Sequence, residues 1–585
     1  MNTNTMKKKA LIGLVFVLAF AAFSTAAFAG ILKSPYLIYP GQNTQMQVLW
    51  QDNGSETTNV ISWGTDTLCS MGTTTVAEYG SYNQHKYTIT GLTPNTKYYY
   101  QVADQTNGVY GAGSFITAPD ENVTSIRFTA QGDSRTNPFT FDNMVKAMKA
   151  FYSQPGYEDY QRLSIHNGDW VSTDGESYWT SQWFDPTKTD IVAYTSNTPI
   201  NGVKGNHDNA SGYSATFPKY FPFPYVNQTA KTVAPLTDAS GNPYYNNLYW
   251  SFDYGPVHFT FVDQYSTYAV GTAQRNWLEN DLATTTKPWK VLVYHAPAYS
   301  AGSDADDTTV RQLEPLVTQY GVDVIYCGHS HNYARTGAYT LAQAGGDTVA
   351  LNVPHITSGG GGAPVYQPDM TNMNSYPHVI TAWPSTEFMA FDIQGKTLTM
   401  TAYQVNSASS TTINPLSTTF PAADGGSTLS LSPIETTVVN HFTNVSPQVS
   451  VTSSGFLYSR ATGKYTGNLT ITNNGSSDLT GNIHVVLDGI LNLPGIGNAD
   501  NQYSTTTPKL ASKIAANPAT GKTSPAGSGL ISTVTLLNAT GSNNGEPMIR
   551  VSANGLAAGD SITVPLQFSN PNNVKINFNP VTYQE

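Results

Sequence analysis

Short stretches of alternating hydrophobic and polar residues fill the chain from residue 30 to residue 121. Segments 46–50 (MQVLW) and 59–64 (NVISWG) place every second side chain on the same face of a strand. Segment 86–104 (KYTITGLTPNTKYYYQVAD) predicts a strand, a turn containing Pro and Asn, and a second strand rich in tyrosine. Strands and turns at this spacing are typical of a β-sandwich, so we predict an all-β domain here.

From residue 122 to residue 405, hydrophobic strands alternate with segments of helical period. Segment 141–153 (FDNMVKAMKAFYS) places its large hydrophobic side chains on one helical face, and Asp142 is suited to cap its N-terminus. A second helix is predicted over residues 272–284 (TAQRNWLENDLAT). The predicted strands are 126–131, 163–167, 197–205, 258–263, 290–295 and 323–328. This alternation predicts an α/β domain of mixed sheets flanked by helices.

The last third of the chain returns to a strand pattern. Residues 406–430 are rich in Ser, Thr, Pro and Gly, which predicts a linker. Residues 431–585 contain two alternating strands around an Asn-Gly turn at 465–489 and a further strand at 561–570. Because we find no cluster of reactive side chains in this part of the sequence, we predict a C-terminal β-sandwich that serves as a spacer or adhesion module.

The N-terminus has the pattern of a secretory signal peptide over residues 1–29. Three lysines at 7–9 precede a hydrophobic run at 10–23, and Ala27 and Ala29 form a cleavage site before Gly30. A membrane anchor helix is the alternative, but the short run and the Ala-x-Ala site favour cleavage. The sequence therefore predicts a secreted or periplasmic protein with no transmembrane segment after cleavage.

The length, charge and cysteine content of the chain exclude some classes of protein. The chain has 585 residues, of which 11% are charged and 12% aromatic, with a net charge of −11. Its length indicates several domains. Without a basic face, stable binding of nucleic acid is not expected. The two cysteines, Cys69 and Cys327, fall in different predicted domains, so we expect no disulfide framework.

Five short polar segments each follow a hydrophobic strand in the α/β region. They are GDSR at 132–135, NGDW at 167–170, GNHD at 205–208, VYHAP at 293–297 and CGHSH at 327–331. Any one alone is an ordinary turn or a hydrogen-bonded histidine. Because strand carboxyl ends share one edge of an open α/β sheet, the five together predict one pocket of oxygen and nitrogen ligands. Such a set suits iron, manganese or zinc rather than calcium.

The order of these segments resembles that of the calcineurin-like metallophosphoesterase superfamily, especially its purple acid phosphatase branch. Further similar segments are YWSFDYGPVHFTFVD at 249–263, AQRNWLENDL at 273–282, GHSHNYAR at 328–335 and ITSGGGGAP at 356–364. The Leu-x-Pro-x-Thr-x-Tyr pattern that begins at Leu92 resembles a fibronectin type III sandwich, which suits the same branch. The resemblance implies a metallophosphoesterase sandwich fold between the two β-sandwiches.

The resemblance also implies a centre of two metal ions, with iron, zinc or manganese as the candidates. Asp169 would lie between the ions, Asp133 and His331 would hold the first, and Asn206, His295 and His329 would hold the second. Two close cations neutralise phosphate oxygens and lower the pKa of a bound water.

Two neighbouring residues are catalytic candidates. His207, next to a predicted ligand, would face the phosphate and stabilise the transition state or protonate the leaving alkoxide. Asp208 would orient the His207 ring. The alternative for His207 is a packing residue of the turn.

The chain departs from the family pattern at two positions. Many members have a histidine ligand two residues after the first aspartate, where this chain has Arg135. The purple branch has a tyrosine three residues after the second aspartate, where this chain has Ser172. The first ion would therefore bind weakly or not at all, and the purple colour should be absent. Arg135 is either a phosphate clamp or the partner of Asp133, Asp174 or a neighbouring carboxylate.

The resemblance implies an enzyme: a secreted phosphoesterase in which a metal-bound hydroxide attacks phosphorus. The substrate would be a phosphomonoester or a phosphodiester such as a nucleotide. The alternative is a degenerate member that acts as a secreted binding, surface or filament protein and self-associates through its β-sandwiches.

Overall fold

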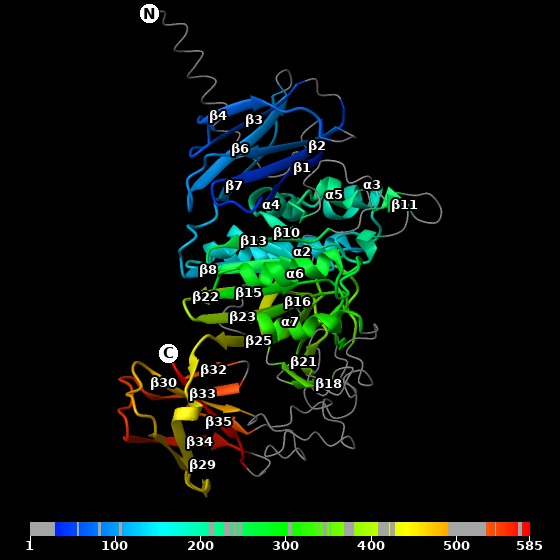
Figure 1. Cartoon of the computed structure of the whole chain (residues 1–585). Coiled ribbons are helices and arrows are strands. Elements are labelled where there is room, and N and C mark those ends of the chain that lie inside the picture. The colour runs from blue at the N-terminus through cyan, green and yellow to red at the C-terminus, as the bar shows by residue number, and fades with distance from the viewer. Residues whose placement is uncertain are drawn as a thin grey trace, which may run out of the picture.

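A computed structural model gives the fold of most of the chain (Figure 1). The structure describes residues 30–54, 58–79, 83–104, 108–209, 216–226, 236–237, 243–244, 248–301, 307–336, 339–342, 348–351, 353–367, 379–407, 420–421, 428–488, 534–543, 546–570 and 576–585. The predicted signal peptide and most of the predicted linker lie outside these ranges. Within them, every helix is too short or too polar to cross a membrane.

The N-terminal part is a β-sandwich of a three-stranded and a four-stranded sheet, ordered β1-β2-β5 and β4-β3-β6-β7. Its strands are β1 (Ile31–Ile38), β2 (Met46–Asp52), β3 (Asn59–Gly64), β4 (Gly72–Thr75), β5 (Gln84–Ile89), β6 (Lys97–Asp104) and β7 (Gly108–Ile116). Val48, Trp50 and Tyr100 lie in the core between the sheets, as the alternation of the sequence predicts.

The central part contains two seven-stranded sheets. The first is ordered β10-β9-β8-β22-β23-β25-β24 and the second β13-β14-β15-β16-β20-β17-β21. The first contains β8 (Ser125–Gln131), β9 (Ser164–His166), β10 (Ile200–Gly202), β22 (Glu387–Gln394), β23 (Thr397–Ser407), β24 (Phe420–Pro421) and β25 (Thr428–Asn440). The second contains β13 (Trp250–Tyr254), β14 (Val257–Phe261), β15 (Trp289–Val293), β16 (Val324–Cys327), β17 (Tyr333–Thr336), β20 (His355–Ser358) and β21 (Val379–Trp383).

Aromatic side chains join the two sheets face to face. Phe128 of the first sheet stacks on Phe391 at 4.5 Å and meets Phe259 of the second sheet edge-on at 5.2 Å. Tyr326 of the second sheet contacts Phe391 from the same interface. Aromatic side chains bury large areas, so this layer stabilises the sheet pair and fixes how their edges meet.

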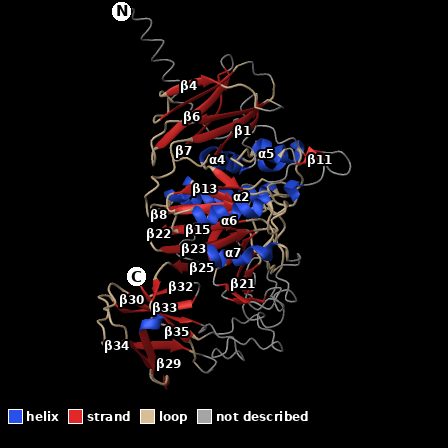
Figure 2. Cartoon of the chain, in the orientation of Figure 1, coloured by secondary structure: helices blue, strands red, loops and turns tan. Residues whose placement is uncertain are grey.

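Helices cover the outer faces of both sheets (Figure 2). The longer ones are α2 (Pro138–Tyr152), α4 (Thr189–Asn197), α6 (Ala273–Thr284) and α7 (Glu314–Tyr320). On the first sheet, Phe151 of α2 packs against Phe388 and Tyr403. On the second, α6 and α7 share a separate hydrophobic core with β15 and β16. The observed layers, helix–sheet–sheet–helix, confirm the predicted fold class.

Helix α2 begins earlier than the sequence predicted. Asn137, not Asp142, is the N-cap: its side-chain oxygen accepts hydrogen bonds from the backbone N–H groups of Phe139 and Thr140. Pro138 takes the first helical position, for which its fixed φ is suited. The Asp142 carboxylate instead accepts a hydrogen bond from the Ile191 N–H and connects α2 to α4.

The first sheet also extends past the boundary that the sequence predicted. Strand β25 pairs antiparallel with β23 along its whole length, although residues from 431 onward were expected in the C-terminal sandwich. The Glu435 carboxylate accepts hydrogen bonds from Arg335 and Tyr333 of the second sheet. These buried contacts make β25 part of the central domain.

The C-terminal part is a second β-sandwich at the opposite end of the central domain from the first (Figure 1). Its sheets are ordered β26-β35-β30-β33-β32 and β27-β29-β34-β31, with β28 paired to β29. The strands are β26 (Thr443–Asn444), β27 (Val449–Ser453), β28 (Leu457–Ser459), β29 (Lys464–Asn473), β30 (Ile483–Asp488), β31 (Thr535–Leu536), β32 (Gly541–Asn543), β33 (Glu546–Ser552), β34 (Ser561–Ser569) and β35 (Asn579–Gln584). Leu469, Val485 and Phe568 are buried in its own core.

Candidate metal centre

Four of the predicted ligand residues lie in the turns that follow strands. In the first sheet, Asp133 follows β8 and Asp169 follows β9, and these two strands are parallel. In the second sheet, His295 follows β15 and His329 follows β16, which are also parallel. Parallel neighbours end at one edge of a sheet. The stacking of the two sheets brings both edges to one place.

Three of these residues have a left-handed backbone, which is uncommon for residues other than glycine. The φ angles are +53° at Asp133, +56° at Asp169 and +65° at His329. Each such residue costs about 1–3 kcal/mol and persists where the surrounding structure imposes it, commonly at functional sites. Close approach adds a further constraint, because a Cβ atom at Gly205 would lie 2.1 Å from Asp169 Oδ1.

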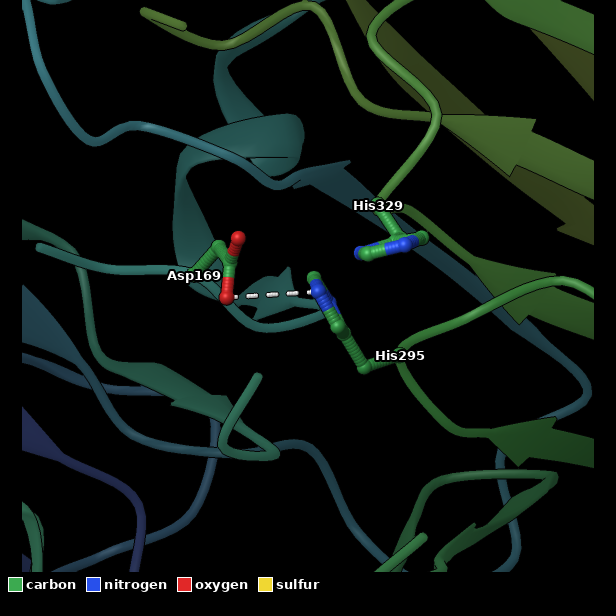
Figure 3. A group of neighbouring side chains, drawn as sticks. All are labelled: Asp169, His295 and His329. Carbon is green, nitrogen blue, oxygen red and sulfur yellow. Dashed lines mark ion pairs between the residues drawn. The ribbon is translucent and has the colours of Figure 1, made fainter. Parts of the chain in front are cut away.

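Four predicted ligands form what we call the second-ion group: Asp169, Asn206, His295 and His329. Ligand atoms of Asp169, His295 and His329 all lie within 4.8 Å of one another (Figure 3). Asn206 Oδ1 lies 3.1 Å from His295 Nε2 and 3.0 Å from His329 Nδ1. His295 Nδ1 donates to the carbonyl oxygen of Asn167 at 2.9 Å, so Nε2 faces the group. Two oxygens and two imidazole nitrogens thus converge, a set that fits zinc, iron or manganese.

The remaining ligands, which with Asp169 form the first-ion group, are Asp133 and His331. The guanidinium of Arg135 lies among them. Arg135 Nε donates to Asp169 Oδ2 at 2.9 Å, and Arg135 Nη2 is 3.1 Å from His331 Nε2. Asp133 Oδ2 accepts a hydrogen bond from the His329 N–H, whereas Asp133 Oδ1 is buried with no hydrogen bond among the described residues. Of the two alternatives for Arg135, the structure therefore contains the ion pair, with Asp169 as the carboxylate.

Comparison with known proteins agrees with this geometry. Residues 126–333 match the calcineurin-like phosphoesterase family, and residues 33–140 match the purple acid phosphatase N-terminal domain. The chain therefore contains a calcineurin-like phosphoesterase domain, preceded by a domain similar to the purple acid phosphatase N-terminal domain. The predicted resemblance is thereby confirmed over residues 33–333, and these matches indicate a phosphoester hydrolase.

Several relatives of this chain are plant proteins. The chain is 25% identical to purple acid phosphatase 18 of Arabidopsis thaliana over 336 residues, which cover 54% of this chain and 68% of that protein. Probable inactive purple acid phosphatase 1 of the same plant is 26% identical over 339 residues, covering 52% and 53% of the two chains. The chain spans about half to two thirds of the length of its first relatives.

Solved structures show the same fold. The purple acid phosphatase PPD1 from yellow lupin (Lupinus luteus) seeds superposes with a TM-score of 0.51 at 17% identity, covering 71% of this chain and 74% of that chain. The structure of PhoD also gives a TM-score of 0.51, at 12% identity, covering 71% and 91%. At these identities the likeness concerns the fold alone.

Burial and charge set the protonation states of the ligand residues in this domain. Burial raises the pKa of Asp133 well above its usual range, and the charge of Asp169 raises it further. Burial also opposes ionisation of Asp169, but the neighbouring His295 and Arg135 hold its pKa far below the usual range. Burial lowers the pKa of His329 to about 3 and that of His331 to about 4. Both imidazoles are therefore neutral near pH 7, which is the form that binds a metal.

The two catalytic candidates, His207 and Asp208, have different surroundings in the structure. His207 is about one-third exposed, with Nε2 3.9 Å from Asp169 Oδ2. Its Nδ1 donates to the Ser172 carbonyl oxygen at 2.7 Å, so this carbonyl orients the ring. Asp208 does not orient it, contrary to the prediction: its buried carboxylate accepts hydrogen bonds from the backbone N–H groups of Trp170 and Gly205. Asp208 is held by the turn because those N–H groups converge on it.

One residue beside the centre was missed in the sequence. The ring of Tyr366 stacks on His331 at 4.1 Å, and the Tyr366 N–H donates to the His331 carbonyl. Just before it, the N–H groups of Gly362 and Ala363 both donate to the Asp133 carbonyl at 2.9 Å. The glycine-rich segment that precedes Tyr366 was the available signal, but nothing in it singled out this tyrosine.

Proposed function

We propose that this protein is a secreted, metal-dependent hydrolase of phosphate esters. The observation that supports the proposal is the second-ion group, because four residues from four separate turns converge on one point in a phosphoesterase domain. The predicted signal peptide supports secretion or a periplasmic location. Phosphomonoesters, or phosphodiesters such as nucleotides, are the proposed substrates.

The fit of the residues to metal ions differs between the two groups. The second-ion group presents Asp169 Oδ1, Asn206 Oδ1 and the imidazoles of His295 and His329, which suit iron, zinc or manganese. A bound ion would supply Lewis-acid activation of the phosphate ester and of a water molecule. The dinuclear form of the proposal needs Asp133 and His331 as well, and Arg135 engages His331. The hydrolase proposal therefore rests on the second-ion group alone.

His207 is the proposed general acid. Its Nδ1–H is fixed by the Ser172 carbonyl, so Nε2 is the nitrogen that exchanges a proton. Because the ring is partly exposed beside the buried ligands, a substrate phosphate could reach Nε2. In its protonated form Nε2 would donate to the leaving alkoxide oxygen.

A non-catalytic role is the second candidate, and the position of Arg135 favours it. A cationic side chain among the first-ion group removes part of the metal-binding capacity of the family site. In that case the domain would bind phosphorylated ligands or serve as a surface or filament protein, with self-association through the sandwiches.

The experiment is a combined metal and activity measurement on residues 30–585. Bound metal is measured by elemental analysis, and p-nitrophenyl phosphate and its bis ester are assayed with added Mn, Zn or Fe. We expect bound metal and turnover, and we expect His295→Ala to abolish both. The control, His484→Ala in the C-terminal sandwich, should behave as wild type. Absence of metal and of turnover under every condition would favour the non-catalytic role.

A further inference from the structure

We propose that the guanidinium of Arg135 takes the place of the first metal ion, so that the centre binds one ion, in the second-ion group, beside a built-in organic cation. The inference deepens the proposed function and rests on it for the remaining ion. It concerns the number of ions and the role of this arginine, and it holds whether or not the protein turns over a substrate.

The two oxygens of Asp169 divide the centre into halves. Oδ1 lies 3.2 Å from His295 Nε2, on the side of the second-ion group. Oδ2 accepts the hydrogen bond from Arg135 Nε at 2.9 Å. In a two-ion centre the Asp169 carboxylate would lie between two metal ions. Here it lies between the second-ion group and the guanidinium of Arg135.

The tautomer of His331 strengthens this assignment. His331 Nδ1 is 2.8 Å from the carbonyl oxygen of Pro364, which can only accept, so Nδ1 carries the proton. The lone pair of a neutral imidazole is then on Nε2, and Arg135 Nη2 donates to it at 3.1 Å. The one lone pair with which His331 could bind a metal is therefore used by Arg135.

The first-ion group keeps too few available ligand atoms to bind a metal ion. Asp133 Oδ1 is its one ligand atom without a hydrogen bond among the described residues. Protein sites for such metals generally use three or four side chains. An arginine itself cannot be a ligand, because it stays protonated and has no lone pair to give.

The position of Arg135 is fixed by its surroundings. It is held two residues after the strained Asp133, and its carbonyl accepts a hydrogen bond from the Asn137 N–H just before α2. Its Nη1 donates to Thr136 Oγ1, and its side chain is only 14% exposed. A guanidinium also matches phosphate oxygens, so the same group could stabilise the phosphoryl charge that a first ion would stabilise.

The test is the number of bound ions, measured without reference to activity. Residues 30–585 are stripped with chelator, titrated with Mn²⁺, and examined by elemental analysis and electron paramagnetic resonance. For the wild type we expect one Mn²⁺ per chain and the six-line signal of an isolated ion. Two ions per chain, or the broad signal of a coupled pair, would overturn the inference without any variant being needed, and so would absence of any bound ion.

A matched pair of variants sharpens the test. Arg135→His removes the guanidinium and adds an imidazole, so we expect two Mn²⁺ per chain and a coupled signal. Arg162→His makes the same change in an exposed ion pair with Asp159 and should still bind one ion. An Arg135→His protein that keeps its thermal unfolding transition and binds one ion would contradict the inference. One bound ion in an inactive wild type would instead refute the hydrolase proposal and leave the arginine assignment standing.

Discussion

The two halves of the centre around Asp169 use the same kinds of side chain for different purposes. On one side, two histidines and an asparagine turn their polar atoms toward a common point. On the other, the buried His331 turns its Nε2 toward Arg135. The difference lies in one position of the turn after β8, which is Arg135. All the predicted ligand residues of the motif are present, yet a neighbouring residue that is not a ligand changes what they can bind.

The largest effect is expected from Asp169→Asn, because Asp169 belongs to both halves. Removing its charge leaves the Arg135 guanidinium unpaired, and an unpaired buried charge costs about 3–5 kcal/mol. We expect that loss in the free energy of unfolding, measured in urea, together with loss of bound metal and of turnover. Asp190→Asn, which removes a more exposed ion pair with Lys149, should cost about 1 kcal/mol or less. Equal losses in the two variants would mean that Asp169 does not connect the halves.

The two halves can be compared directly with His295→Ala and His331→Ala. The first removes a ligand of the second-ion group and should abolish stoichiometric metal binding. The second removes one acceptor of Arg135 and no member of the second-ion group, so it should leave one ion in place. Elemental analysis after dialysis measures the number of ions bound per chain in both variants. If His331→Ala lost the ion and His295→Ala kept it, the roles assigned to the two halves would be exchanged.

A smaller effect is expected from His207→Ala, which leaves the ligands of both halves intact. If His207 acts as the general acid, kcat should fall by about 10²- to 10⁴-fold, the usual contribution of acid–base catalysis. Bound metal should be unchanged, because the ring is held by the Ser172 carbonyl and its Nε2 lies 3.9 Å from Asp169 Oδ2, beyond hydrogen-bond distance. An unchanged kcat, or a kcat lost together with the metal, would remove the proposed role.

The most local effect concerns the pH dependence of stability and a histidine outside the centre, His258. Its ion pairs with two aspartates can be compared with the buried ion pairs of the centre. Burial lowers the pKa of His258, but hydrogen bonds to Asp253 and Asp281 raise it to about 9. The protonated pair therefore stabilises the fold fully below about pH 6.5, the ordinary value, and its contribution disappears as the pH rises through 9.

We thus expect the difference in unfolding free energy between wild type and His258→Gln to be about 3 kcal/mol larger at pH 6 than at pH 10. Urea unfolding at both values measures it. His355→Gln, which does not touch these two aspartates, should show no comparable pH dependence. A difference that grows with pH would contradict the protonated state of His258.

Much of the centre could be predicted because strand ends are rigid and their order along the chain is visible. Asp133, Asp169, His295 and His329 follow hydrophobic strands, and parallel pairing within each sheet brings such residues to one edge of that sheet. The partner of Arg135 could not be predicted, since a long side chain reaches several acceptors and tertiary packing decides among them.

Other differences have similar causes. Asp208 follows His207 in the sequence, yet the turn directs it to backbone N–H groups, because a buried carboxylate is stabilised best where several donors converge. The end of the central domain was placed too early, because strand β25 alternates like the strands of the sandwich that follows it. Alternation identifies a strand but not the sheet that it joins.

Strand β25 has a mechanical consequence for the whole molecule. Only two residues separate its end at Asn440 from β26, the first strand of the C-terminal sandwich. One of them, His441, stacks on Trp289 at 3.7 Å and pairs with Asp323. So short and well-anchored a connection behaves as a stiff joint. Tension transmitted along β25 from the C-terminal sandwich would load the β23–β25 hydrogen bonds in shear, so many of them would have to break together before the central domain yielded.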